Sequence, residues 1–436
     1  MEVAALLTAL RTARPQGRAI AGFNFDITTI RRLVIGTKDR ETGGPHAPVS
    51  LSDSLNARFK LVWDDGRVSR GVMERRAIES DPHPVLASAL AAAYDDPDAR
   101  TILGPSAFPD VPTLDPGTVK LAEGAIDPFV PRLEAIRARL ADHGLKTWSG
   151  SMQAAHGNTR LLTSAGLDVE AEGTSTSWSV SFDGESVGAG KSGRRLEPFE
   201  EFALRLDRLV TLVLALRGTA PARPGGVVPV LFHPGVVEDY VLAVLLHNLD
   251  GEQVAHGTGA FTRAQFGSGF ASLRPDLTLR TDPLVPFASG AYRFTREGVP
   301  AAPVTLIDRG RLATPMLDLK YARRLGLPPN APPAAMDTLF FEGALAIDEP
   351  AALGAAAGGV LVLGVLGVHT QDFTSGDFSL SAPQSLAIGA NGFEGRLRGT
   401  VSGNLFELLR SDDLAFVRFP GETTPGLLVR CRFDAQ

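Results

Sequence analysis

A short segment rich in proline and glycine, TAPARPGG at residues 219–226, divides the chain into two parts of different character. Immediately before it, residues 198–216 carry apolar side chains at three- and four-residue spacing between a proline and a glycine, which predicts a long helix. Beyond it, short apolar runs alternate with glycine-containing turns. Because proline and glycine interrupt regular elements, we predict two domains, residues 1–222 and 223–436.

The first part is expected to combine long helices with hairpin strands. Residues 127–143 have apolar side chains at helical spacing, and this second long helix most simply packs against residues 198–216. A dimerising coiled coil is the alternative, but the repeat lasts under three heptads. Strands are expected at residues 57–63, 67–75, 159–164 and 167–182, the first two joined by the turn Asp64-Asp65-Gly66. The pattern predicts an α/β domain with a mixed or antiparallel sheet and long packed helices.

The second part is expected to be rich in strands, with a few helices. Its strands should lie at residues 227–232, 302–307, 359–368, 385–388 and 426–432, and its helices near residues 236–249 and 317–325. Residues 351–368 are uncharged and approach the length of a membrane span, but glycine and alanine dominate their first half. We therefore expect a turn of helix and a buried strand there, and no membrane span. The fold class of the whole chain is predicted to be α+β.

Composition excludes several classes of partner. The 436 residues are 44% hydrophobic and 21% charged, with a formal charge of -6 and no sustained basic stripe, so nucleic-acid binding is not expected. The single cysteine, Cys431, cannot form an internal disulfide and lies in the strand-like run LLVRCRF, which fits a structural role in a reducing cytoplasm. The first residues do not resemble a secretory leader. We predict a cytoplasmic protein.

Histidines between residues 229 and 261 raise the question of a metal site. A hydrolytic zinc helix needs two imidazoles aimed at one ion and a carboxylate beside the bound water. His247, Glu252 and His256 do not meet this requirement, because nine residues place the two histidines on roughly opposite faces of a continuous helix. We therefore expect no metal in this chain, and His247 to be buried or to line a channel.

Two further segments carry polar groups that could form a site. Residues 187–192 end like a phosphate-binding loop, but Glu185 stands where that loop requires a glycine, so a surface loop is favoured. His369, Asp372 and Asp377 follow a predicted buried strand, where polar groups can face a cleft. The alternative is that Asp377, like Asn404 further on, only bonds turn amides.

The order of several motifs resembles the TldD/TldE family, in which TldE is also called PmbA and which is often labelled modulator of DNA gyrase. The motifs are Leu161–Leu167, Asn248–Glu252, Gly257–Phe261, Gly298–Leu312, Ala322–Gly326, Thr374–Ser379 and Val401–Leu405. In this alignment Leu242 and Ala243 occupy the positions of the first zinc-binding His and the catalytic Glu of the active TldD-type subunit, and His247 occupies that of the second His. The family's acidic segment before Val-Pro is replaced by residues 294–298, FTREG.

The resemblance implies a TldE/PmbA-type subunit that lacks the zinc motif and has no catalytic residues of its own. Such a subunit would form a heterodimer with a TldD-type partner, which supplies the zinc, and would act on unfolded or extended peptides; an isolated chain could form a homodimer. His247, His369, Asp372 and Asp377 are the candidates for lining the substrate channel. Two alternatives remain: an active homodimeric peptidase with an atypical site, and a non-enzymatic modulator that binds peptides.

Overall fold

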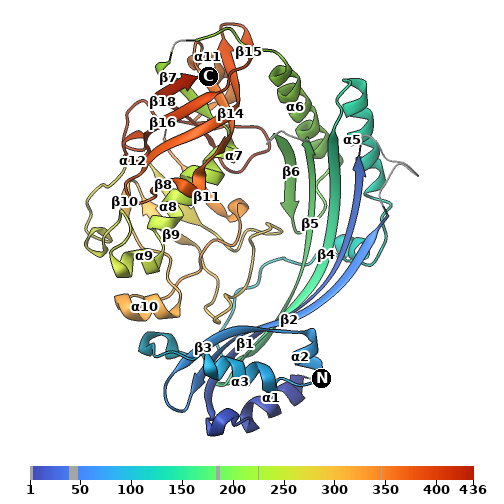
Figure 1. Cartoon of the computed structure of the whole chain (residues 1–436), viewed down its shortest axis with the longest axis vertical. Coiled ribbons are helices and arrows are strands. Elements are labelled where there is room, and N and C mark those ends of the chain that lie inside the picture. Colours follow the sequence, from blue (N-terminus) through green and yellow to red (C-terminus); the bar gives the residue numbers. More distant parts are fainter. Residues whose placement is uncertain (1–2, 39–47, 183–186, 224, 345) are drawn as a thin grey trace.

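A long, curved antiparallel sheet and a barrel-containing unit face one another across the molecule (Figure 1). The computed structural model describes residues 3–38, 48–182, 187–223, 225–344 and 346–436. These residues combine helices and sheets, so the predicted α+β class is confirmed. No helix among them is long and apolar enough to cross a membrane.

The first half is built on a six-stranded sheet. Its strands follow the order β3 (Val68–Glu74), β2 (Ser50–Trp63), β1 (Ile20–Lys38), β4 (Trp148–Thr163), β5 (Asp168–Phe182) and β6 (Gly188–Gly193). Every neighbouring pair is antiparallel. The hairpin around Asp64-Asp65-Gly66 is confirmed, whereas β1 was not predicted and β4 begins 11 residues before the predicted start at residue 159.

The helices of this half lie near the two ends of the sheet (Figure 1), except for residues 116–122, which contact β4 and β1. They are α1 (Val3–Thr12), α2 (Arg75–Glu79), α3 (His83–Ala91), α4 (Pro116–Ala122), α5 (Val130–Asp142) and α6 (Phe199–Arg217), with the 3-10 turns η1 (Pro15–Gly17) and η2 (Pro97–Arg100). As predicted, α5 and α6 pack together, and Arg139 on α5 forms a 2.6 Å ion pair with Asp207 on α6. Leu133 and Leu209 belong to the same buried cluster.

The segment predicted as a surface loop at residues 187–192 is a strand instead. Residues 188–193 form β6, the edge strand beside β5, while Glu185 lies outside the described residues. Its glycines explain how a sequence without strand-forming residues enters the sheet. A Cβ at Gly188 would lie 2.6 Å from the Val180 carbonyl oxygen, and one at Gly190 would lie 2.7 Å from that of Trp178. The strand therefore requires residues without side chains at these close approaches.

The second half contains a larger and a smaller sheet. The larger sheet has the order β12 (Ala346–Asp348), β17 (Ala415–Arg418), β18 (Gly426–Ala435), β16 (Gly399–Asn404), β14 (Asp377–Gly389), β13 (Val360–Leu366) and β7 (Gly226–Phe232), with β15 (Gly392–Arg396) beside β14. Pairing of β18 with β7 closes part of it into a barrel. The smaller sheet has the order β10 (Arg311–Leu312), β9 (Val304–Asp308), β8 (Thr278–Thr281) and β11 (Leu339–Glu342).

Short helices fill and flank these sheets. They are α7 (Pro234–Val236), the π-helical turn η3 (Val237–Leu242), α8 (Ala243–Asn248), α9 (Gly251–His256), α10 (Leu319–Leu325), α11 (Glu349–Ala355) and α12 (Leu405–Leu408), with the 3-10 turns η4 (Arg263–Gln265), η5 (Met336–Thr338) and η6 (Val368–Thr370). The turn of helix and strand predicted within residues 351–368 correspond to α11 and β13. The second half thus has the predicted β-rich character.

One buried cluster connects the two halves. Leu209 on α6 packs in the same cluster as Leu361 on β13 and Leu386 on β14. The predicted division between residues 222 and 223 falls in the connection between α6 and β7. Apolar packing across this connection holds the six-stranded sheet against the barrel-containing half, and it thereby fixes the walls of the space between them.

Candidate functional site

The helical segment that resembles a zinc helix is largely apolar where it would need metal ligands. η3 runs directly into α8, so Leu242 is the last residue of the π-helical turn and Ala243 the first of α8. The Leu242 side chain is 0% exposed and belongs to the main core of the second half. Neither side chain can donate to a metal ion or remove a proton from water. The residues at these two positions therefore do not fit a zinc site.

His247 and His256 contact different side chains and do not face one another. His247, half-buried near the end of α8, packs edge-on against Phe373 with ring centroids 5.5 Å apart. His256 ends α9, where its Nε2 atom lies 2.8 Å from Nη1 of Arg324. Among the described residues, no three His, Cys, Asp or Glu side chains gather in a group that could hold a metal ion.

Asn248 connects three segments that are distant in the sequence. Its side chain is 0% exposed; the Nδ2 group donates to the carbonyl oxygens of Val244 at 2.9 Å and Phe373 at 2.8 Å. Its Oδ1 atom accepts from the Ala260 amide at 2.6 Å. The Thr374 hydroxyl adds a 3.1 Å bond to the carbonyl of Thr258. Residues 257–261 and 372–376 are thus held against α8 through one buried amide.

Sequence reasoning did not select Asn248, although it lies inside one of the quoted motifs. The available signal was its place next to His247 and before Asp250, which caps α9 by accepting from the Glu252 amide at 2.7 Å. A polar residue that is buried between the end of one apolar helix and the start of the next needs a hydrogen-bond partner. That partner, Phe373, is 125 residues away and cannot be identified from spacing.

The polar residues after β13 mostly stabilise their own turn. Asp372 is exposed and accepts from the amides of Thr374 at 2.8 Å and Ser375 at 3.3 Å, and these bonds lower the pKa of its carboxyl group. Asp377 begins β14 and accepts from Nδ2 of Asn404 at 2.8 Å. Asp372 therefore bonds amides of its own turn, whereas Asp377 pairs with the side chain of Asn404, whose Oδ1 accepts from the Glu407 amide at 3.1 Å.

His369 lies exposed in η6, a turn preceded by Gly367 in the left-handed conformation. The segment therefore brings His247 against Phe373 and places Asp372 in the same turn as Phe373, but it does not gather the four predicted channel residues around one cavity. Their position in a channel stays a prediction.

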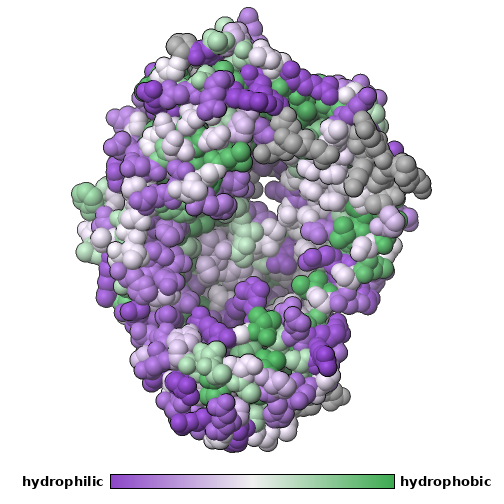
Figure 2. Space-filling model, in the orientation of Figure 1, coloured by the Kyte–Doolittle hydropathy of each residue, from purple (hydrophilic) through white to green (hydrophobic). Residues whose placement is uncertain are grey.

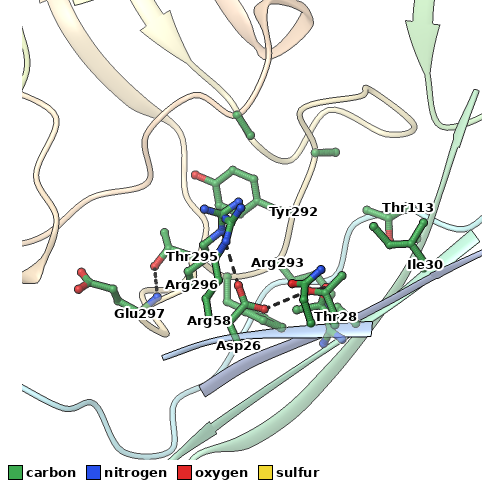
Figure 3. A pocket seen from close by; sticks show the side chains of 18 of the residues that line it. Asp26, Thr28, Ile30, Arg58, Thr113, Tyr292, Arg293, Thr295, Arg296 and Glu297 are labelled. Carbon is green, nitrogen blue, oxygen red and sulfur yellow. Dashed lines mark hydrogen bonds and ion pairs between the residues drawn. The ribbon is translucent and has the colours of Figure 1, made fainter. Parts of the chain in front are cut away.

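A large cavity lies elsewhere, between the concave face of the six-stranded sheet and residues 291–299 (Figures 2 and 3). Its volume is about 1230 Å³. Figure 2 shows it as a hollow near the centre of this face. Strand alternation creates its floor, because Phe23, Phe25 and Ile27 of β1 turn toward the helices while Asp26 and Thr28 turn toward the cavity.

Charged side chains from both halves meet in this cavity. Seven are cationic and four are acidic: Arg32, Arg58, Lys60, Arg70, Arg194, Arg293 and Arg296, and Asp26, Glu172, Glu297 and Asp318. The floor comes from β1, β2, β4 and β5, and residues 330–334 complete the wall beside residues 291–299. The cavity therefore combines an open, charged interior with the edge strand β3, which contributes residues 70–72.

Asp26 is the buried acid at the floor of the cavity. It is 6% exposed, lies opposite Arg58 in the β1–β2 register, and accepts from the Thr28 hydroxyl at 3.3 Å. Nε of Arg296 lies 3.5 Å from its carboxylate (Figure 3). Burial raises the pKa of Asp26, and the positive charges of Arg296 and Arg58 only partly oppose that effect.

A second ion pair joins the sheet to the opposite wall. The Lys60 ammonium donates to the Thr101 carbonyl at 2.9 Å and to Glu297 at 3.3 Å. The other carboxylate oxygen of Glu297 accepts from the Leu319 amide at the start of α10 at 2.8 Å. Burial lowers the pKa of Lys60, while Glu297 opposes that shift. Glu297 thus connects β2 to α10 across the cavity.

None of the four residues proposed from the sequence lines this cavity, and the sequence did not indicate most of those that do. The only hint was the replaced acidic segment at residues 294–298, which contains Arg296 and Glu297. The remaining lining residues alternate along strands, and β1 itself was not recognised. Recognition of β1 would have placed Asp26 and Thr28 on one face.

Comparison with known proteins gives the class of the second half. Residues 225–428 match the family model of the PmbA/TldA metallopeptidase C-terminal domain. A relative from Methanocaldococcus jannaschii, the uncharacterized protein MJ0231, is 24% identical over 281 residues. That match spans 62% of this chain and 64% of the relative, which is less than two thirds of its length. The second half is a metallopeptidase-type C-terminal domain.

Solved structures extend the similarity to the whole fold. TldE from Thermococcus kodakarensis has a TM-score of 0.76 at 18% identity, covering 95% of this chain and 97% of that one. A putative modulator of DNA gyrase from Bacteroides thetaiotaomicron has a TM-score of 0.75 at 18% identity, with coverage of 96% and 95%. One from Thermotoga maritima gives 0.73 at 18% identity, with 99% of each chain covered. The second half thus matches the PmbA/TldA metallopeptidase C-terminal domain, and the whole chain has the fold of these TldE and gyrase-modulator structures.

Proposed function

We propose that this chain is the TldE/PmbA-like, non-catalytic subunit of a heterodimeric zinc metalloprotease. The partner is a TldD-type subunit that supplies the zinc ion and the catalytic Glu, and the substrates are unfolded or extended peptides rather than nucleic acid. The cytoplasm is the proposed location, because a lone buried cysteine suits a reducing compartment.

The observation that carries this proposal is the pair Leu242 and Ala243. In the alignment with the active subunit they stand where zinc-binding His and catalytic Glu are expected, and Leu242 is sealed in the core at 0% exposure. A hydrolytic zinc site needs an open coordination position reached by substrate. A core leucine supplies neither a ligand nor access, which supports assigning the chemistry to a partner chain.

The cavity supports a role in holding peptide. At about 1230 Å³ it exceeds the range of roughly 300–1,000 Å³ usual for small-ligand pockets. The edge strand β3 lines part of it, and Val72 on that strand is among the exposed large apolar residues. An extended chain can pair its backbone with an open strand edge and bind with little sequence preference. This arrangement suits an unfolded substrate.

The predicted channel residues belong to the same proposal. His247, His369, Asp372 and Asp377 would line the part of the channel that the partner completes. Alanine substitution of each should lower the peptidase rate of the assembled dimer, while H83A, which removes an exposed histidine at the start of α3, should leave it unchanged. Unchanged rates for all four variants would remove these residues from the channel.

The decisive experiment measures zinc content and cleavage of an unfolded protein for three samples. They are this chain alone, a TldD-type subunit of the same organism alone, and the two mixed, with the assembly state followed by light scattering. The proposal expects a heterodimer in the mixture, zinc bound to the partner, and cleavage that needs both chains.

Other outcomes identify the alternatives. Chelator-sensitive cleavage and stoichiometric zinc in this chain alone, as a homodimer, would establish an active peptidase with an atypical site. Binding of unfolded peptide without any cleavage in the mixture would establish a non-enzymatic modulator. Either result would overturn the subunit role.

A further inference from the structure

Five of the seven cations in the cavity fall into two groups according to what they already bind; of the other two, Arg70 pairs with Glu297 at 3.8 Å and Arg32 lies on β1. Arg194 donates to the carbonyls of Ala291 at 2.5 Å and Ala288 at 3.2 Å, and Arg293 donates to that of Pro109 at 3.0 Å. Lys60 is held by the Thr101 carbonyl and Glu297. These groups satisfy backbone acceptors and hold the wall in place, so they are not available to a ligand.

Arg58 and Arg296 form the second group. Arg296 has a side chain that is 68% exposed, and its ion pair with Asp26 is long at 3.5 Å. Arg58 is exposed on β2, and no hydrogen bond or ion pair to its guanidinium is found within the part of the chain that the structure describes. Figure 3 shows both residues beside Asp26 in the cavity. Most of their donors face the open space.

We propose that Arg58 and Arg296 form a carboxylate-binding subsite in the cavity, with Asp26 as an internal counter-ion. A peptide carboxylate would accept from the two guanidinium groups, and the Asp26 carboxylate would partly offset their positive charge when the cavity is empty. This inference rests on the proposed peptide-binding role and names its substrate class: extended peptides that carry an acidic side chain or a free C-terminal carboxylate.

Geometry and charge favour an anionic group at this point. Guanidinium donors bind carboxylates best in paired, short contacts of about 2.7–2.9 Å, which the 3.5 Å approach of Arg296 to Asp26 does not reach. The β-strand backbone and the 3.3 Å bond from the Thr28 hydroxyl place Asp26 in the floor of the cavity. An incoming carboxylate is free to adopt the paired geometry.

The buried Asp26 carboxylate competes with a peptide carboxylate for the two arginines. Its carboxylate partly offsets the positive charge of the two arginines, so replacement by neutral asparagine should strengthen carboxylate binding. The shape of the side chain is nearly unchanged in D26N, and its amide oxygen can still accept from Thr28. A structural role for Asp26 in the subsite would instead weaken binding when the charge is removed.

The test uses three fluorescent, unstructured peptides of equal length and the purified full-length chain, with binding followed by anisotropy. One peptide carries internal Glu residues and an amidated C-terminus, the second is neutral with a free C-terminus, and the third is neutral and amidated. R58Q and R296Q should each weaken binding of a carboxylate-bearing peptide by about tenfold or more, the loss expected for a charge-assisted hydrogen bond.

Controls separate the subsite from bulk charge. R430Q removes an exposed cation from β18, outside the cavity, and should leave all three affinities unchanged. The neutral amidated peptide should bind wild type and both cavity variants alike. Preference for the first peptide over the second assigns the subsite to acidic side chains, and the reverse preference assigns it to the peptide C-terminus.

Equal binding of all three peptides by wild type, equal effects of R430Q and R296Q, or weaker binding by D26N would each overturn the carboxylate subsite. Absence of peptide binding by the chain, alone and in the mixture, would overturn it as well. These readouts do not depend on zinc or cleavage. Failure of the subunit role would appear separately, as partner-independent hydrolysis.

Discussion

Replacement of Asn248 by alanine should loosen two distant segments at once. The variant removes the bonds to the carbonyls of Val244 and Phe373 and to the Ala260 amide, at 2.9, 2.8 and 2.6 Å. Three bonds at about 1 kcal/mol each give a loss of roughly 3 kcal/mol. The orphaned Ala260 amide and Phe373 carbonyl would pull the segments toward solvent.

Hydrogen exchange detected by mass spectrometry measures the local part of this loss. A cost of about 3 kcal/mol makes opening of the affected segments roughly a hundredfold more frequent. Deuterium uptake should therefore rise at residues 257–262 and 371–376, while uptake at β1 stays as in wild type. Urea unfolding should show a lower midpoint with the same slope.

Two further variants separate hydrogen bonding from packing. N248D keeps the acceptor for Ala260 but turns a second oxygen toward two carbonyls and buries a charge, so it should destabilise the protein at least as much as N248A. N391A removes an exposed asparagine between β14 and β15 and should change neither readout. The reasoning is refuted if N248A unfolds within about 0.5 kcal/mol of wild type with unchanged uptake, the range of ordinary surface substitutions.

Three other predictions follow from buried groups. E297A leaves the Lys60 ammonium without its acid and should cost about 3–5 kcal/mol in urea unfolding, whereas K60M should cost less; equal losses would contradict this asymmetry. Burial and a nearby arginine lower the pKa of His233 to about 3. The stability of the protein should therefore be full above about pH 6.5 and fall as the pH is lowered below that value. H233N keeps an acceptor for the Gly235 amide and should make the melting temperature depend less on pH. Burial raises the pKa of Cys431 to about 12, so at about pH 8 dithionitrobenzoate should react with one thiol only after denaturation; reaction of the native protein would show that β18 opens.

The long helices and the first hairpin were predictable because their signals are local. Helical spacing in residues 127–143 and 198–216 marks α5 and α6, and an Asp-Gly turn marks the β2–β3 connection. β1 carries a comparable signal, since buried Phe23 and Phe25 alternate with polar residues. Those polar residues, including charged Asp26, face the cavity and not open solvent. A strand whose second face lines a polar cavity lacks the uniform pattern of a half-buried strand.

The candidate site also has parts that local sequence signals could predict and parts that they could not. The order of the motifs identified the segments around His247 and Asp377, because the residues of each single motif are close together in the sequence. It could not identify Asn248 as the group that connects them, or the cavity, because both depend on contacts between distant residues. Asp26 and Arg58 become neighbours only through the register of β1 and β2. Register across a 32-residue separation is a property of the folded sheet.

Residues 294–298, which depart from the family's sequence pattern, connect a signal in the sequence to contacts that only the fold shows. From the sequence alone, residues 294–298 show only that basic Arg296 replaces an acid. In the fold, Arg296 meets the buried Asp26, and its neighbour Glu297 meets the buried Lys60, so each charge in this segment has an opposite charge on the facing sheet. An acid at residue 296 would face Asp26 and repel it. The basic residue is therefore matched to the floor of this cavity, and the same match leaves Arg296 exposed beside Arg58, where an acidic peptide would meet both.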